Sequence, residues 1–199
     1  KIADFSKNID FSDLPKVFEF IDSLKKKKIN ICGVSTMGSD VPHILAKISK
    51  HYGWVGPSIK TGEWASNKYL MKKRLSLKNI PVPNFALVEN YHEIEKIWNH
   101  WNCSKIVIKP TDRAGSRGVR LLDNKKNIER DFKYAMNNSN INQVLIEEYI
   151  EGPQISTESI IFDNISLTPG FADREYSNME AFHPQIMENG GWIPSRLSE

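Results

Sequence analysis

Hydrophobic residues recur at helical spacing near the start of the chain. In SDLPKVFEFIDSLKKKK, apolar side chains three or four residues apart predict one face of a helix, and Ser12 or Asp13 precedes them as a cap. The lysines at 25–28 come in the last turn, where positive charge suits the helix dipole. We therefore interpret these lysines as a solvated helix end rather than as a phosphate-binding patch.

A strand, a turn and a second helix are expected next. The short apolar run INICGV, residues 29–34, predicts a buried parallel strand, and STMGSD predicts a turn. DVPHILAKISKHYG predicts a helix with Asp40 near its cap and Pro42 in its first turn. The helix start near Gly38 is a candidate anion site, but a helix capped by Asp40 is the simpler interpretation. This order of elements indicates one half of an α/β domain.

The pattern changes after residue 56. Apolar residues at helical spacing predict a helix from about Ser66: Leu70, Met71 and Leu75. Pro81 and Pro83 then predict an extended linker, followed by a strand over NFALVE. NYHEIEKIWNHW predicts a helix whose apolar side chains share one side: Ile94, Ile97, Trp98 and Trp101. We interpret these aromatic rings as core rather than as a platform for stacking bases.

The remaining elements predict a small α+β lobe. IVIKP and VRLL read as two antiparallel strands of a hairpin. NKKNIERDFKYAMNNS predicts a helix with three inward side chains: Ile128, Phe132 and Ala135. VLIEEYIEG predicts a strand that stops at Gly152 and Pro153, and QISTESIIFDN predicts another. The expected fold class is therefore α/β followed by α+β.

Composition narrows the class of protein. The chain has 199 residues, is 40% hydrophobic and 26% charged, and suits one globular domain or two small ones. Its net charge of +3 is too small to indicate nucleic-acid binding. No apolar run approaches the ~18 residues of a membrane-spanning helix and no signal peptide is recognisable, so we expect a cytoplasmic protein without a membrane partner. Cys32 and Cys103 lack metal-ligand spacing and are interpreted as idle thiols.

The loop in IVIKPTDRAGSRGVRLL raises the question of a ligand. Lys109 ends an apolar strand, and Arg113 and Arg117 stand close by, which suggests an anionic ligand. Three residues of the loop would present donors to phosphate, the glycines by turning backbone N–H groups and the serine through its hydroxyl: Gly115, Ser116 and Gly118. Neither the dinucleotide fingerprint nor the Walker pattern is present, and a simple hairpin fits the same residues.

Three segments occurring in order resemble the ATP-grasp family: ASNKYLMKKRLSLKNIPVP, IVIKPTDRAGSRGVRLL and VLIEEYIEGPQIS. The resemblance runs from about Gly33 to the end of the chain. It is nearest to the carbamoyl-phosphate-synthase-like and D-alanine-ligase-like branches, whose members join a carboxylate to an amine or similar nucleophile through an acyl phosphate. The expected fold is an incomplete ATP-grasp fold preceded by the tail of a Rossmann-like domain.

The resemblance implies a role for each matching residue. Lys68 and Lys109 would be the two phosphate lysines, and the glycine loop would be the flap over the triphosphate. The hinge over Glu147, Glu148, Tyr149 and Ile150 would hold adenine. Within it, the Glu148 carbonyl and the Ile150 N–H would face the base.

Two positions depart from the family pattern. Gln154 stands where relatives often carry an acidic residue for the ribose hydroxyls, and an amide oxygen accepts one hydrogen bond there. Asn67 stands before Lys68 where many relatives carry aspartate. These differences concern the contacts to the nucleotide and not the fold.

The acceptor region offers weaker candidates. FADREYSNMEAFHPQ resembles the stretch that runs toward the acceptor site in ligase-like members. His183 reads as a base or as a surface residue, and Arg174 or Arg196 reads as a carboxylate anchor. No catalytic acid or base is assigned. Magnesium ions are required for acyl phosphate formation, and their ligands are expected beyond residue 199.

The expected organisation has three parts: the end of a preceding α/β domain over 1–64, the small nucleotide-clamping lobe over 65–150 and the start of the large lobe over 151–199. Because the chain begins without methionine and stops at RLSE, we expect a fragment that is inactive alone. In the whole protein we expect an ATP-dependent carboxylate-amine ligase with ATP and Mg²⁺. The alternative is a non-catalytic nucleotide-binding or regulatory module. The expected partners are ATP and small carboxylate and amine substrates, without nucleic acid, and a homodimer is allowed.

Overall fold

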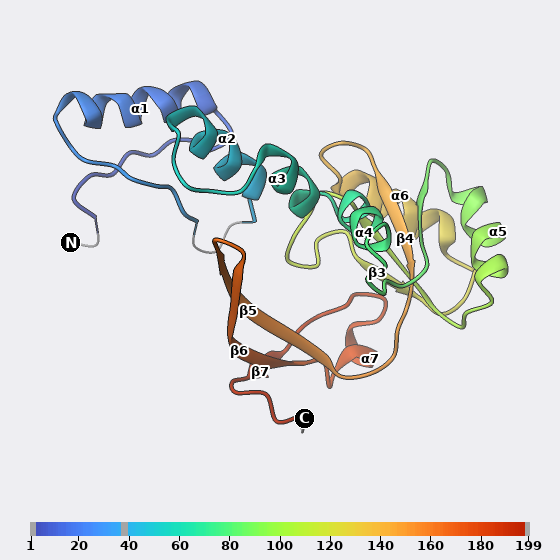
Figure 1. Cartoon of the computed structure of the whole chain (residues 1–199). Coiled ribbons are helices and arrows are strands. Elements are labelled where there is room, and N and C mark those ends of the chain that lie inside the picture. The colour runs from blue at the N-terminus through green and yellow to red at the C-terminus, as the bar shows by residue number, and fades with distance from the viewer. Residues whose placement is uncertain (1–2, 37–39, 198–199) are drawn as a thin grey trace. The chain divides into compact units, whose positions relative to one another are not determined.

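The computed structural model describes residues 3–36 and 40–197, and the chain divides into two compact units over 1–80 and 81–199 (Figure 1). The turn around Gly38, with its candidate anion site, lies outside the described residues. The division into 1–64, 65–150 and 151–199 stays a prediction.

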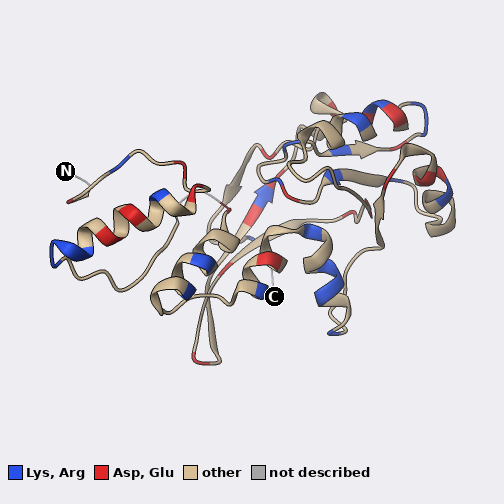
Figure 2. Ribbon diagram, turned by 90° about the horizontal axis from the view of Figure 1, so that it is seen from above, with Lys and Arg blue, Asp and Glu red and all other residues tan. Residues whose placement is uncertain are grey.

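The first unit consists of helices. Their bounds are α1 (Leu14–Lys26), α2 (Pro42–Tyr52), α3 (Ile59–Ser66) and α4 (Lys68–Ser76). The α1 prediction is confirmed, with Asp13 as the cap that accepts a hydrogen bond from the Lys16 N–H. Basic residues close this helix, as expected for its negative dipole end (Figure 2).

Two expectations for the first unit are wrong. Residues 29–34 form no strand, and their side chains are exposed or half-buried. Among the described residues of this unit there is no strand with which this segment pairs, so an apolar run alone does not make a sheet. In addition, α2 starts with Val41 at its cap position and without a side-chain cap, so Asp40 does not cap it, although Pro42 does occupy the first turn.

The helix expected from about Ser66 is α4, which begins at Lys68 and is separated from the preceding α3 at Asn67. The Asn67 side-chain oxygen accepts hydrogen bonds from Tyr69 N–H at 3.0 Å and Leu70 N–H at 3.1 Å, which caps α4. Sequence patterning missed α3, although Ser58 caps it in the usual way. The helix contains Gly62, where an added Cβ would come within 2.8 Å of the Pro42 carbonyl oxygen. Glycine therefore allows α3 to pack closely on α2.

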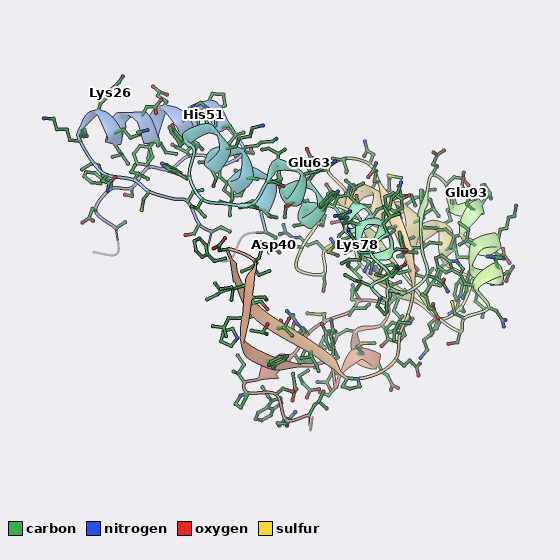
Figure 3. All side chains as sticks on the ribbon, in the orientation of Figure 1. Lys26, Asp40, His51, Glu63, Lys78 and Glu93 are labelled. Carbon is green, nitrogen blue, oxygen red and sulfur yellow. The ribbon has the colours of Figure 1, made fainter. Side chains whose placement is uncertain are left out.

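Rings and one hydroxyl join α1 to α2. The Phe18 ring of α1 stacks on His51 of α2 with 4.2 Å between centroids. His51 is labelled in Figure 3. The Tyr52 hydroxyl donates to Asp22 Oδ1 at 2.9 Å and to the Phe18 carbonyl at 3.2 Å. Burial and then the Asp22 carboxylate raise the pKa of Tyr52 to about 12, so this donor keeps its proton.

The second unit is built around a four-stranded antiparallel sheet in the order β1-β4-β2-β3. Its strands are β1 (Phe85–Val88), β2 (Ile106–Pro110), β3 (Arg120–Leu122) and β4 (Val144–Glu148). Helices α5 (Tyr91–Trp101) and α6 (Ile128–Asn138) pack on this sheet (Figure 1). Each of these six elements was predicted from the sequence, including the antiparallel pairing of β2 with β3.

Side chains alternate between the two faces of this sheet. One face joins the helices in a single core, which contains Ile94, Trp98, Ile108, Phe132 and Ile146. The interpretation of the tryptophans as core is therefore confirmed. The other face carries the intervening residues of the same strands, including Lys109 and Glu147.

A second antiparallel sheet holds β5 (Gln154–Phe162), β6 (Ile165–Glu175) and β7 (Gly190–Trp192), with the short helix α7 (Met179–Phe182) between β6 and β7. Only β5 was predicted. Asp163 and Asn164 turn β5 into β6, both at positive φ. The register places Ile160 and Phe162 of β5 opposite Leu167 and Ile165 of β6, and these four apolar side chains are 62% to 71% exposed. At the other end of the two strands Gln154 pairs with Arg174 and Ser156 with Ala172.

A histidine holds α2 against α3. His43 Nδ1 lies 2.7 Å from Ser66 Oγ, which donates to the Gly62 carbonyl at 2.8 Å. Burial, and then the positive charge of Lys47, lowers the pKa of His43. Because the folded pKa is below the unfolded value of about 6.5, this contribution to stability is complete above that pH and decreases as the pH falls.

We therefore predict that the wild-type protein loses more stability between pH 8 and pH 5.5 than His43→Gln does. Glutamine keeps a hydrogen-bonding group beside Ser66 but does not titrate in this range. Urea unfolding of both proteins at the two pH values measures the difference. Equal losses would show that His43 does not couple the α2–α3 contact to protonation.

Candidate functional site

The central strands of the first sheet carry a nearly buried ion pair. Lys109 Nζ of β2 lies 2.7 Å from Glu147 Oε2 of β4, and the two side chains are 18% and 7% exposed. Charged groups this far from water are stabilised only when they are paired. Val107, Leu121 and Leu145 share this face and are buried, so the pair is surrounded by an apolar floor. The structure thus brings together two of the residues predicted as a binding site.

Backbone groups become available at one end of β4. The strand ends at Glu148, whose side-chain Oε2 accepts from Asn84 Nδ2 at 2.9 Å. The Tyr149 N–H donates to the Lys105 carbonyl at 3.1 Å. The next N–H, that of Ile150, donates to no group in the described part of the chain, and its side chain is exposed. This N–H is therefore open to a ligand acceptor.

The hinge and Lys109 lie at opposite ends of the same pair of strands. Ile106 pairs with Glu148, whereas Lys109 pairs with Leu145, three residues further along β2. At the rise of an antiparallel strand this is a separation of about 10 Å. A ligand on this face that reaches from the hinge to the lysine is therefore elongated, with a hydrogen-bonding group at one end and negative charge at the other.

The loop after β2 continues from the charged end. Gly115, Ser116 and Gly118 all have positive φ, which gives the tight turn expected from the sequence. At Gly118 an added Cβ would approach Pro110 Cγ to 2.6 Å, whereas the space around Gly115 is open. Gly118 is thus required for packing, and Gly115 belongs to an exposed tip.

Sequence reasoning missed what holds this loop. Asp112 accepts hydrogen bonds from Ser139 Oγ and the Asn140 N–H, each at 2.8 Å. Arg113 Nε donates to the Asn138 carbonyl at 2.7 Å. The partners are more than twenty residues away at the end of α6, so no local sequence signal identifies these contacts.

The other residues predicted from the sequence lie in the second sheet, in the segment that follows it and in α4. Gln154 begins β5 and pairs with Arg174 of β6. Arg174 binds Glu188 and donates to Ser156 Oγ at 3.2 Å, and Arg196 donates through its Nε to Asp173 at 3.3 Å. Lys68 belongs to the first unit, where it is the first residue of α4.

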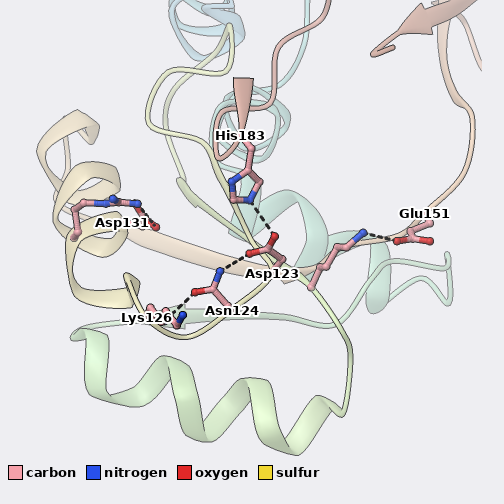
Figure 4. Close-up of polar contacts among 8 residues, drawn as sticks. Asp123, Asn124, Lys126, Asp131, Glu151 and His183 are labelled. Atoms are coloured by element: carbon pink, nitrogen blue, oxygen red, sulfur yellow. Dashed lines mark hydrogen bonds and ion pairs between the residues drawn. The ribbon is translucent and has the colours of Figure 1, made fainter. Parts of the chain in front are cut away.

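His183 lies at the β3 edge, beside the end of the sheet that carries the hinge. Its Nε2 is 3.4 Å from Asp123 Oδ2 (Figure 4). The neighbouring Pro184 carbonyl accepts from the Leu121 N–H at 2.7 Å. A recess of ≈ 330 Å³ borders both residues and also Asp131. Neither Lys109 nor Glu147 lines this recess. His183 thus holds a loop against β3 and is separate from the Lys109 end of the site.

Within residues 3–36 and 40–197, no three His, Cys, Asp or Glu side chains gather closely enough to hold a metal ion. The expectation of magnesium ligands beyond residue 199 stays a prediction. None of the described helices is both long and apolar enough to cross a membrane. Both cysteines are free thiols, and burial raises the pKa of Cys103.

Comparison with known proteins gives a consistent result. The family model for an ATP-grasp domain matches residues 65–199. A D-alanine--D-alanine ligase from Coprothermobacter proteolyticus is 26% identical over 108 residues, which is 53% of this chain and 35% of the ligase.

Two solved structures share the fold. An L-amino acid ligase from Bacillus licheniformis has a TM-score of 0.69 at 19% identity, over 90% of this chain and 41% of the ligase. The ADP complex of purK, an N5-carboxyaminoimidazole ribonucleotide synthetase, has a TM-score of 0.75 at 14% identity, over 100% of this chain and 48% of the synthetase. The chain therefore spans about a third to a half of the length of these relatives.

The ion pair generates a prediction about stability. Lys109→Met removes the cation that lies 2.7 Å from Glu147 Oε2. We expect a loss of about 2–4 kcal/mol, somewhat below the ~3–5 kcal/mol of a fully buried pair because Lys109 retains some exposure. The double variant Lys109→Met/Glu147→Gln removes both charges and should recover much of that loss. Urea unfolding measures both, and a double variant no more stable than the single one would contradict the coupling.

Proposed function

The chain belongs to the ATP-grasp domain family, and on that basis we propose that it is the nucleotide-binding part of an ATP-dependent ligase. In the whole protein, ATP would activate a carboxylate as an acyl phosphate, which an amine or similar nucleophile then attacks. The carboxylate-amine ligase relatives support this class of reaction. The identities of the carboxylate and of the amine are not specified by the described residues.

The observation that carries the proposal is the arrangement of groups along β2 and β4. The open Ile150 N–H follows the end of β4 at Glu148, and Lys109 lies about 10 Å along β2 from the position that pairs with Glu148. An adenine at the hinge would place its triphosphate toward Lys109 and the glycine loop. A neutral hydrogen-bonding end and a cationic end match the two ends of ATP.

We assign a role in nucleotide binding to each residue along this face of the sheet. The Glu148 carbonyl and the Ile150 N–H would hydrogen-bond the two edges of adenine, and Glu147 would help to hold its amino group. The buried Val107 and Leu145 would exclude water beneath the base. Lys109 would pair with phosphate, and its bond to Glu147 would fix its position before the nucleotide arrives. Lys68 is proposed as a second phosphate lysine on the resemblance alone.

Two more features support the proposal without defining the reaction. The glycine loop would cover the phosphates and exclude water during phosphoryl transfer. Mg²⁺, when bound, would neutralise phosphate charge, but no residue described here is assigned to hold it. The alternative of a regulatory nucleotide-binding module shares the same contacts and differs only in turnover.

We predict that loss of Lys109 weakens ATP binding by about tenfold or more, because a hydrogen bond to a charged group is worth roughly 1.5–3 kcal/mol. Calorimetric titration of the full-length protein with a non-hydrolysable ATP analogue measures this. The test compares Lys109→Ala with Lys109→Met/Glu147→Gln, in which the fold is expected to be more stable. Lys96→Ala, which removes an exposed lysine of α5, is the control for charge.

Unchanged affinity in both Lys109 variants would contradict the phosphate assignment. If the wild-type protein bound no analogue, the nucleotide proposal itself would fail. Phosphate release from ATP across a panel of carboxylates and amines then separates a ligase from a regulatory module.

A second prediction concerns the ribose. Gln154 begins β5, four residues after Ile150 of the hinge, and an amide accepts hydrogen bonds less strongly than a carboxylate. Gln154→Glu should therefore tighten adenosine nucleotides severalfold but leave binding of free adenine unchanged. Titration with adenosine diphosphate and with adenine checks this. Equal affinity for the diphosphate before and after the change would place the ribose elsewhere.

A further inference from the structure

The two arginines of the loop after β2 have different surroundings. Arg113 is part-buried, and its Nε donates to the Asn138 carbonyl, the last residue of α6. A guanidinium at this position stabilises the negative end of the helix dipole. The Arg113 guanidinium therefore already stabilises the fold through its contact with the end of α6.

The neighbouring Asp112 strengthens the same attachment. Its two carboxylate oxygens accept from Ser139 Oγ and the Asn140 N–H. Ser139 Oγ in turn accepts from the Gln143 N–H at 3.1 Å, and the Thr111 N–H donates to the Gln143 carbonyl at 3.2 Å. The start of the loop is thus fixed to the whole turn between α6 and β4.

The far end of the loop is fixed as well. Gly118 is buried between Pro110 and Asn138, where a Cβ would come within 2.6 and 2.7 Å of their side chains. Both ends of the loop are therefore held against the same helix end. Only residues 114–117 remain between them.

The tip over 114–117 is held by bonds within the loop. Arg117 Nε donates to the Ala114 carbonyl at 3.3 Å, and the Val119 N–H donates to the Ser116 carbonyl at 3.1 Å. Arg117 is exposed and forms no ion pair with any residue in the described part of the chain. Its weak, local hydrogen bond is easily exchanged for a stronger one to a phosphate oxygen.

We propose that Arg117 is the loop residue that binds the triphosphate, and that Asp112 and Arg113 are positioning residues that confine the moving part of the loop to 114–117. This inference rests on the proposed nucleotide function. Arg117 would add a planar, two-pronged donor to the point charge of Lys109, so the loop would recognise phosphate by side chain as well as by backbone.

Titration of the full-length protein tests the role of Arg117. Arg117→Ala should weaken binding of adenylyl imidodiphosphate with magnesium by about tenfold and leave adenosine binding unchanged. Arg117→Lys should lose less, because it keeps the charge. Lys133→Ala, which removes an exposed lysine of α6, should change neither affinity.

Limited trypsin digestion tests the positioning residues, because trypsin cleaves after arginine. Cleavage after Arg117 should precede cleavage after Arg113, and adenylyl imidodiphosphate should slow the first cut where adenosine does not. Asp112→Asn should expose the Arg113 site, because the amide replaces one of the two acceptor oxygens with a donor.

The outcomes distinguish a failure of the Arg117 proposal from a failure of the proposed nucleotide function. If the wild-type protein bound no triphosphate, the proposed function would fail. If it bound triphosphate and Arg117→Ala bound equally well, only the assignment of Arg117 would fail. First cleavage after Arg113 in the wild-type protein would overturn the positioning role.

Discussion

The pair between Lys109 and Glu147 is the interaction on which the candidate site depends. It lies on the two central strands of the sheet, where each charge would be costly without the other. The pair fixes Lys109 at a defined point beyond the buried apolar residues of the same face. The opposite face packs against α5 and α6 in the hydrophobic core, so a ligand would bind on the face that carries Lys109.

A second dependence links the loop to the end of α6. The same turn that starts β4 also holds Asp112 and Arg113, so the loop is attached to the strand that carries Glu147 and the hinge. A substitution in the α6–β4 turn would therefore alter the position of both the loop and the hinge. This explains why a short connection of ordinary residues, 138–143, matters to a site to which it contributes no charge.

Elements α5, α6 and β1–β4 could be predicted because their hydrophobic residues recur with a clear helical or strand period. Those residues are buried in the core between the sheet and the two helices. The prediction of a strand over residues 29–34 is wrong, because an apolar run does not show whether a partner strand is present. Sequence patterning missed α3, which is short and contains Gly62, and it missed β6, although Asp163 and Asn164 are a recognisable hairpin turn. The site residues came from a resemblance. The contact between Lys109 and Glu147, and the anchoring of Asp112, depend on strand register and on a distant helix end, which no local pattern contains.

The short tip of the loop also has a thermodynamic consequence. Ordering a residue of flexible backbone costs about 1–2 kcal/mol of conformational entropy, so immobilising 114–117 costs about 4–8 kcal/mol. If 111–118 were all free, the cost would be about twice as large. By holding the two ends in advance, the protein transfers half of that cost from ligand binding to folding, and more of the interaction energy with a ligand remains as affinity.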